Sequence, residues 1–159
     1  MSQESASARQ AALEALEVEL SRLFRRSRSQ SFRLAREVHP DLDVAGYGML
    51  SALRRIDPEG TGVRAVDVAA ATSLHKSTTS RAIHDLQQLG LVSRAPDPDD
   101  ARAALIRVTD DGRAALERSS AGRRATMARG LEQWSETDLS QLATLLARFN
   151  EIDLNQPQE

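Results

Sequence analysis

Between residues 9 and 38 apolar side chains recur at three- and four-residue intervals, and the segment holds no Gly or Pro. This spacing predicts one long amphipathic helix, because it brings the apolar positions onto one face. His39 and Pro40 are expected to end the helix, since the residue before a proline is pushed out of the α region. The apolar stripe consists of Leu13, Leu16, Leu20, Leu23 and Phe24.

Three more helices are predicted next along the chain. The first covers about 44–56 and ends in the turn residues of 57–60, and the second is short, at about 66–72. The third covers about 76–89, with Gly90 as its C-terminal stop. Three or four residues separate the last two helices, which is typical of a helix-turn-helix.

Two short β-capable runs follow, 91–94 and 103–108, on either side of a turn rich in Pro and Asp, and they predict a β-hairpin. Thr109 is expected to cap a fifth helix that extends to about residue 131, and Ser135 to cap a sixth. The whole pattern predicts a mainly α fold with one small β-hairpin. The apolar stripe of the sixth helix consists of Leu139, Leu142, Leu145, Leu146, Phe149 and Ile152.

Composition narrows the classes of function. The chain of 159 residues has no cysteine, which excludes disulfides, thiol nucleophiles and thiolate metal sites. Aromatic residues make up 3%, so a site that stacks bases on several rings is not expected. No run of about eighteen apolar residues is present, and the N-terminal residues lack the apolar centre of a signal peptide. We therefore expect a soluble, cytoplasmic protein.

The formal net charge of −2 hides an uneven distribution of charge. Residues 76–129 carry ten basic side chains against seven acidic ones, whereas residues 131–159 carry one Arg against six acids. All basic residues except Lys76 are arginines, which suit contacts to phosphate and guanine. Codon bias in a GC-rich genome is the larger cause of the arginine excess, so the excess does not by itself indicate DNA binding.

A helix-turn-helix followed by a β-hairpin is a winged helix, and at this point the chain resembles the MarR family of bacterial transcriptional regulators. The matching segments are Val63–Thr72, Ser77–Arg81, Leu89–Arg94, Asp100-Ala101-Arg102 and the run from Leu105 to Gly112. The order of elements agrees over nearly the whole chain. The resemblance implies a winged helix-turn-helix flanked by N- and C-terminal dimerisation helices.

The second helix of the motif is expected to present short hydroxyls and cations to double-stranded DNA. Such side chains can approach phosphates and base edges, although Ser and Thr near a helix start are individually explained as well by capping. Arg81 suits a bidentate contact to guanine. Ser73 and His75 depart from the family pattern, which usually has a turn Gly and a capping Asp or Ser there. The candidate DNA contacts on this helix are Lys76, Ser77, Thr78, Ser80 and Arg81.

In the wing, the resemblance implies that Arg102 enters the minor groove and that Asp100 orients it. A guanidinium favours the negative potential of a narrow minor groove. The alternative is an ordinary surface pair in a turn, which contributes little to stability. Arg94, on the first strand of the hairpin, is a candidate phosphate contact or a solvated strand residue.

The apolar stripes of the terminal helices predict a homodimer, although they could also fold back on the core of the same chain. The family supports a dimer, and a two-fold dimer would place two recognition helices one helical turn apart on a pseudopalindrome. The predicted organisation is a dimerisation region at 9–38 and 113–154, a DNA-binding lobe at 43–112, and flexible tails at 1–8 and 155–159. The predicted dimer contacts are Leu13, Leu16, Leu20, Leu139, Leu142, Leu146 and Phe149.

The resemblance also implies a small-molecule inducer, often aromatic or anionic, that binds between the dimer helices and the DNA-binding lobe. No cofactor is expected. His75 and His84 cannot share a metal, because they are nine positions apart and would point to opposite faces of a helix. A metal site of His39 with acidic residues stays open, but no spacing demands it. A core or solvent-facing role suits each pocket candidate at least as well as ligand binding. The pocket candidates are Arg36, His39, Tyr47 and Arg55.

These observations predict a sequence-specific DNA-binding regulator, a ligand-responsive repressor that binds a pseudopalindromic operator as a homodimer. An enzyme is disfavoured, because the sequence has no phosphate-cradling glycine loop, H-E-x-x-H motif, nucleophile elbow or paired histidines. A winged-helix module that binds protein and not DNA is the other alternative, and Ser77, Arg81 and Arg102 argue against it.

Overall fold

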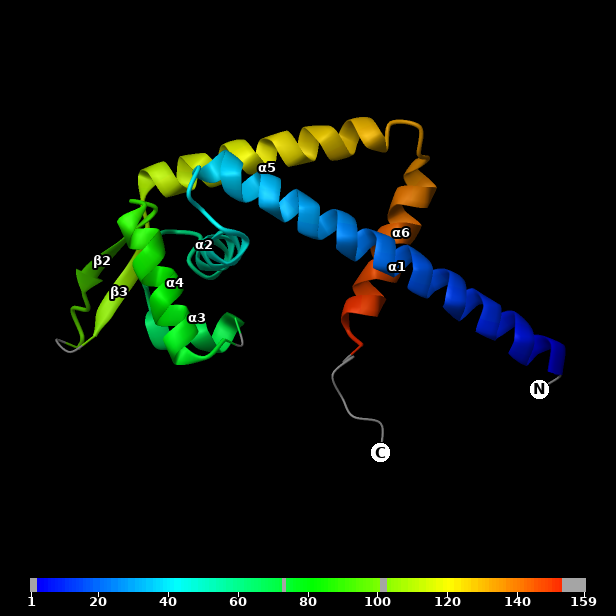
Figure 1. Cartoon of the computed structure of the whole chain (residues 1–159), viewed down its shortest axis with the longest axis horizontal. Helices are drawn as coiled ribbons and strands as arrows, with labels where there is room; N and C mark the ends of the chain where they lie inside the picture. Colours follow the sequence, from blue (N-terminus) through cyan, green and yellow to red (C-terminus); the bar gives the residue numbers. More distant parts are fainter. Residues whose placement is uncertain (1–2, 73, 101–102, 153–159) are drawn as a thin grey trace. The chain divides into compact units, whose positions relative to one another are not determined.

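The computed structural model describes residues 3–72, 74–100 and 103–152. The chain divides into two compact units, Met1–Ser120 and Ala121–Glu159, and the division falls within one helix (Figure 1). The predicted fold class, mainly α with a small antiparallel sheet, is confirmed. The elements are α1 (Gln3–Val38), α2 (Val44–Ile56), β1 (Val63–Arg64), α3 (Ala65–Thr72), α4 (Lys76–Gln88), β2 (Val92–Pro96), β3 (Ala104–Val108), α5 (Asp110–Gly130) and α6 (Glu136–Asn150).

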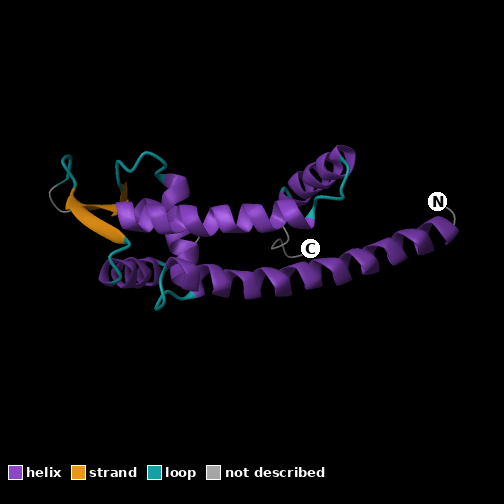
Figure 2. Cartoon of the chain, turned by 90° about the horizontal axis from the view of Figure 1, so that it is seen from above, coloured by secondary structure: helices purple, strands orange, loops and turns teal. Residues whose placement is uncertain are grey.

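The first helix, α1, is continuous over its whole length (Figure 2). It begins earlier than expected, so residues 3–8, which the sequence suggested as part of a tail, are helical; the segment contains no helix breaker. The helix ends at Val38, directly before His39 and Pro40, as predicted. In its last turn the N–H of His39 donates to the carbonyl of Ala35 at 3.0 Å. Among the described residues, no helix is long and apolar enough to cross a membrane.

A buried carboxylate organises the loop between α2 and β1. Asp57, 7% exposed, accepts hydrogen bonds from the N–H of Thr61 at 2.9 Å, the hydroxyl of Thr61 at 3.1 Å and the N–H of Gly62 at 2.8 Å. The turn at this position was predicted, but the side chain that holds it was not. Burial acts to raise the pKa of Asp57, but the hydrogen bonds from Gly62 and Thr61 outweigh burial and lower it.

The predicted hairpin is present as β2 and β3, and a third strand extends it. The strand order is β1-β3-β2, and both pairings are antiparallel. In the hairpin Val92 lies opposite Val108, while the two residues of β1 pair with Ile106 and Leu105. The strand β1, which leads directly into α3, was not predicted, because two residues carry no readable alternation.

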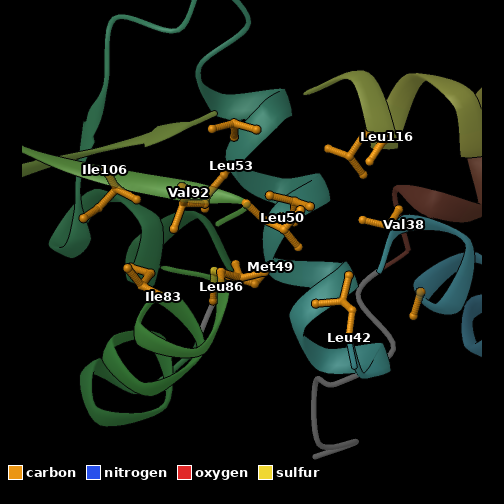
Figure 3. Close-up of a cluster of buried hydrophobic side chains, with 14 of the residues drawn as sticks. Val38, Leu42, Met49, Leu50, Leu53, Ile83, Leu86, Val92, Ile106 and Leu116 are labelled. Carbon is orange, nitrogen blue, oxygen red and sulfur yellow. The ribbon is translucent and has the colours of Figure 1, made fainter. Parts of the chain in front are cut away.

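The core of the first unit is aliphatic and joins α1, α2, α4, α5 and the sheet (Figure 3). Leu50 and Leu53 of α2 and Ile83 and Leu86 of α4 belong to this one cluster, and all four are at most 1% exposed. Because one face of α4 is buried in this way, the opposite face is held outward in a fixed register.

Hydrogen bonds of Thr109 connect the start of α5 to the residues between α4 and β2. The predicted cap, Thr109, accepts a hydrogen bond from the N–H of Gly112 at 3.1 Å and donates to the carbonyl of Gly90 at 2.8 Å. Gly90 has a φ of 71°, the left-handed conformation that a C-terminal stop requires. The predicted stop and cap are therefore confirmed.

In the second unit, α6 begins at the predicted cap. The hydroxyl of Ser135 accepts from the N–H of Asp138 at 3.1 Å and donates to its carboxylate at 2.6 Å. None of the residues of α6 is buried. An apolar stripe is therefore exposed along this helix, formed by Leu139, Leu142, Leu145 and Leu146.

Candidate nucleic-acid interface

The helix α4 has one buried and one exposed face. Thr79, Ile83 and Leu86 point inward, and Thr79 is 1% exposed. The outward face carries the hydroxyls and cations that the sequence analysis proposed as DNA contacts, and the omission of Thr79 from that set agrees with its burial. The exposed candidates are Lys76, Ser77, Thr78, Ser80 and Arg81.

The N-terminus of α4 has an unusual cap. His75 occupies the N-cap position with extended backbone, but its side chain makes no capping hydrogen bond. The first N–H groups of a helix have no intrahelical partner, and together with the helix dipole they favour an anion. Because His75 stands in place of an Asp or Ser cap, the N-cap side chain does not accept hydrogen bonds from these N–H groups. Ser73, the other departure, lies outside the described residues.

A hollow of about 430 Å³ lies between α4 and the wing, and we call it the wing-side hollow. The structure brings four sequence candidates together on its wall. Three of them are cationic or hydroxylic side chains from two different elements, which suits a phosphate backbone. The candidates on this wall are Lys76, Ser80, Arg94 and Asp100, and Arg64 joins them.

A second hollow, of about 460 Å³, lies on the other side of α4 towards α2. Thr78 and Arg81 line it, together with the carboxylates of Asp41, Asp43 and Asp85. Asp43 is occupied as the cap of α2, where it accepts from the N–H of Gly46 at 2.6 Å. The candidate contacts of α4 are therefore distributed, because Lys76 and Ser80 line the wing-side hollow, Thr78 and Arg81 line the carboxylate-rich second hollow, and Ser77 lines neither.

An ion pair at the base of the wing was missed by the sequence analysis. Nε of Arg64, on β1, donates to Oδ2 of Asp97 at 2.6 Å, and the Asp97 side chain is 3% exposed. The hydrogen bond from Arg64 and the N–H of Asp99 hold the pKa of Asp97 below its ordinary value. The same contact raises the pKa of Arg64. No sequence signal joined two residues 33 positions apart.

The proposed partnership of Asp100 with Arg102 stays a prediction, because Arg102 lies outside the described residues. The backbone carbonyl of Asp100 accepts from the N–H of Ala103 at 2.9 Å, so this residue has a place in the wing turn.

The four pocket candidates have individual roles in the structure. Nδ1 of His39 accepts from the N–H of Asp41 at 3.1 Å, and Tyr47 packs against the core. Arg36 and Arg55 are exposed near the ends of α1 and α2. None of these four residues lines either hollow beside α4. Their part in ligand binding stays a prediction.

The predicted dimer contacts are apolar side chains that the chain leaves accessible. Leu13 and Leu16 on α1 are 40% and 46% exposed, and Leu142 and Leu146 on α6 are 38% and 39% exposed. The less exposed members, Leu20 and Phe149, are half-buried. Such stripes fit a surface that another chain covers.

The two carboxylates with lowered pKa make stability dependent on pH. Asp57 and Asp97 bind fewer protons when folded than in the unfolded chain, where their ordinary pKa is 3.8. Their contribution is complete well above pH 3.8 and is lost as the pH falls through their folded pKa values. We expect the thermal midpoint, followed by circular dichroism, to fall below about pH 4. Asp57→Asn should lower the free energy of unfolding by about 1 kcal/mol at neutral pH and make the decline of the thermal midpoint at acid pH less steep. An unchanged decline would show that Asp57 does not contribute to it.

Part of the chain is similar to a known family of proteins. Residues 41–103 match the model described as MarR family. Among proteins with curated functions, none matches the sequence significantly. The matched segment contains α2, the helix-turn-helix and β2, and so includes most of the interface described above.

Solved structures of similar fold extend the likeness to nearly the whole chain. A MarR family regulator from Rhodococcus sp. RHA1 is 26% identical with a TM-score of 0.61, and the match covers 84% of this chain and 90% of that one. CouR from Rhodococcus jostii RHA1, bound to p-coumaroyl-CoA, is 25% identical with a TM-score of 0.63, covering 89% and 95%. FabT from Streptococcus pneumoniae, in complex with DNA, is 14% identical with a TM-score of 0.74, covering 87% and 95%. At that identity FabT shows the fold alone.

Proposed function

We propose that this chain is a DNA-binding transcriptional regulator that works as a homodimer and responds to a small ligand, because residues 41–103 match the model described as MarR family and because α3, α4 and the β2–β3 hairpin follow one another as in a winged helix-turn-helix. The observation that carries the proposal is the outward face of α4, where hydroxyls and cations stand opposite a fully buried apolar face. The protein acts by binding and not by catalysis, and its place of action is the cytoplasm, where chromosomal DNA lies.

The major groove receives α4. Ser77, Thr78 and Arg81 are exposed on a helix whose register the core fixes, so they can meet base edges together. Lys76 and Arg94, which line the wing-side hollow, then meet the phosphate backbone beside the groove. Arg102, from the turn of the wing, is assigned to the adjacent minor groove.

The dimer forms through the apolar stripes of α1 and α6. The exposed leucines of both helices would be removed from water by the same helices of a second copy. A two-fold axis then sets the two α4 helices about one turn of DNA apart and selects a pseudopalindromic operator.

The ligand lowers DNA occupancy and makes the protein a repressor that is released from its operator. CouR, which is 25% identical to this chain, is bound to p-coumaroyl-CoA in its structure. A protein with a similar fold therefore accommodates an aromatic, anionic molecule. In this chain Arg36, His39, Tyr47 and Arg55 supply two guanidiniums and two rings suited to such a molecule. A ligand acts here through its different affinities for the free and DNA-bound forms.

Selection from a pool of random double-stranded DNA tests the proposal. The unmodified protein should enrich a pseudopalindromic sequence, and mobility shift with the recovered duplex should show a complex that random duplex does not displace. Enrichment of no sequence would overturn the proposal, and binding that random duplex displaces equally well would reduce it to a non-specific DNA-binding protein.

Replacing Arg81 tests the base contact on α4. Arg81→Ala should weaken binding to the selected duplex by about 1–3 kcal/mol and relax the preference at one base position, because a bidentate contact to guanine is lost. Mobility shift and a repeated selection with the variant measure both effects. The control is Arg118→Ala, which removes an exposed arginine from α5. Equal losses on selected and random duplex would show that Arg81 contacts phosphate.

A further inference from the structure

The ion pair between Arg64 and Asp97 links parts of the winged helix that are far apart in the sequence. Arg64 is the last residue of β1, and Ala65, which follows it, begins α3. Asp97 follows the last residue of β2 and opens the wing turn. Since β3 lies between β1 and β2, the pair spans the sheet from one edge strand to the end of the other.

The Asp97 carboxylate is held on both of its oxygens. Oδ2 accepts from Nε of Arg64 at 2.6 Å, and Oδ1 accepts from the N–H of Asp99 at 2.9 Å. Hydrogen bonds to an ionised group are shorter and stronger than those between neutral groups. A buried carboxylate that loses its charged partner destabilises the folded protein. With 3% of its side chain exposed, Asp97 differs from an ordinary surface partner.

The same residue closes the base of the wing turn through its backbone. The N–H of Asp97 donates to the carbonyl of Ala103 at 3.2 Å, and the N–H of Ala103 donates to the carbonyl of Asp100 at 2.9 Å. One residue therefore connects the turn to itself, through Asp99 and Ala103, and to the start of the helix-turn-helix, through Arg64.

We propose that Arg64 is a positioning residue for DNA binding, which sets the wing turn relative to the helix-turn-helix by holding the carboxylate of Asp97. The inference rests on the proposed function, because it concerns how two DNA-contacting parts keep a fixed spacing. The contacts of α4 in the major groove and of the wing in the minor groove contribute fully to the binding free energy only if both elements are already held in position before DNA binds. Without the pair, the wing has to be ordered as DNA binds, and the affinity falls.

A competing role for Arg64 is direct contact with DNA. Its side chain is 42% exposed and shares the wing-side hollow with Lys76 and Arg94. The two roles predict opposite effects of Asp97→Asn. If Arg64 is a positioning residue, the loss of the carboxylate weakens binding. If Arg64 contacts phosphate, the loss of a nearby negative charge leaves binding unchanged or tightens it.

The experiment measures the affinity of full-length variants for the selected duplex, in versions with A·T-rich and G·C-rich flanks, at two salt concentrations. Asp97→Asn should weaken binding about tenfold and lose most of the preference for A·T-rich flanks, because the wing reads the narrow minor groove. Arg64→Lys keeps the charge but not the Nε donor, and it should weaken binding to a similar degree. The salt dependence should stay nearly unchanged, since no phosphate contact is removed.

The matched control is Asp99→Asn, which changes the charge of the same turn equally while the Asp99 side chain takes no part in the pair. It should bind as the unmodified protein does, or slightly tighter. Affinities are compared well below the thermal midpoint of each variant, with the active fraction titrated.

Three results would overturn the inference. Asp97→Asn binding as tightly as Asp99→Asn would show that the pair positions nothing. A loss for Asp97→Asn that is equal on both flanks and on random duplex would show that the pair does not act through the contact of the wing with the minor groove. Failure of the unmodified protein to bind any duplex would overturn the proposed function and this inference with it.

Discussion

Replacing Leu142 and Leu146 with Glu is expected to separate the homodimer into monomers, or to unfold the chain, and to abolish specific DNA binding. Both side chains lie in the apolar stripe of α6, where they are 38% and 39% exposed in the single chain. Each loses about 1.5–3 kcal/mol of apolar burial, and because a two-fold dimer carries four such changes, the total is on the order of 6–12 kcal/mol. A micromolar to nanomolar dimer would not survive that loss. Light scattering and mobility shift measure the two outcomes.

The charge-matched control places two Glu on the opposite face of the same helix, as Ser140→Glu and Thr144→Glu. This variant should stay dimeric and bind the selected duplex normally. A stable, folded monomer for the unmodified protein would show that the proposed dimer is wrong. An intact dimer for the Leu142 and Leu146 variant would move the interface away from α6.

Adding one methyl group at Gly112 is expected to destabilise the first unit strongly. A Cβ there would press on the carbonyl oxygen of Leu91 and lie 3.2 Å from Cγ1 of Val108. The obstructing atom is backbone, so relief requires the start of α5 to move away from the sheet. We expect Gly112→Ala to cost about 3 kcal/mol and to lower the thermal midpoint by several degrees, although Ala is a better helix former than Gly.

The control is a glycine of the same helix in open space. An added Cβ at Gly122 meets no atom within 4 Å, so Gly122→Ala should stabilise the protein by up to about 1 kcal/mol. Thermal unfolding of the two variants should therefore shift in opposite directions. Equal shifts would show that the contact of Gly112 with Leu91 relaxes at little cost.

The structure explains why a glycine occupies position 112. From the sequence alone it belongs to a run that resembles a family motif. In the structure its N–H donates to the Thr109 hydroxyl, and its missing side chain lets α5 approach the backbone at Leu91. The motif therefore joins a helix cap to the beginning of the wing.

Local rules predicted the helices and most of their ends. The bounds of α2 agree with the prediction, and Gly90, Thr109 and Ser135 serve as the expected stop and caps. These features depend on side chains within about four residues of one another, so the sequence contains them directly. The start of α1 was missed, although residues 3–8 contain no Gly or Pro that would keep the helix from beginning there.

The exposed face of α4 was also within reach of the sequence. The apolar positions Ile83 and Leu86 define its buried face by helical spacing, and Thr79, four residues before Ile83, falls on the same face. The other polar positions in the first two turns then face outward. What those side chains meet was not readable in this way. The division between a cationic hollow and a carboxylate-rich one depends on residues of α2 and of the wing.

The periodic helices, their caps, the hairpin and the family resemblance of the lobe can all be read from the amino-acid sequence, because each depends on neighbours along the chain. Three features emerge only in the folded chain: β1 joins the sheet, Asp57 is buried in its loop, and Arg64 pairs with Asp97. These features form when the antiparallel pairing of β1 with β3 brings distant residues together. No spacing in the sequence records such a meeting, since its geometry is set by how the sheet packs against α2 and α4.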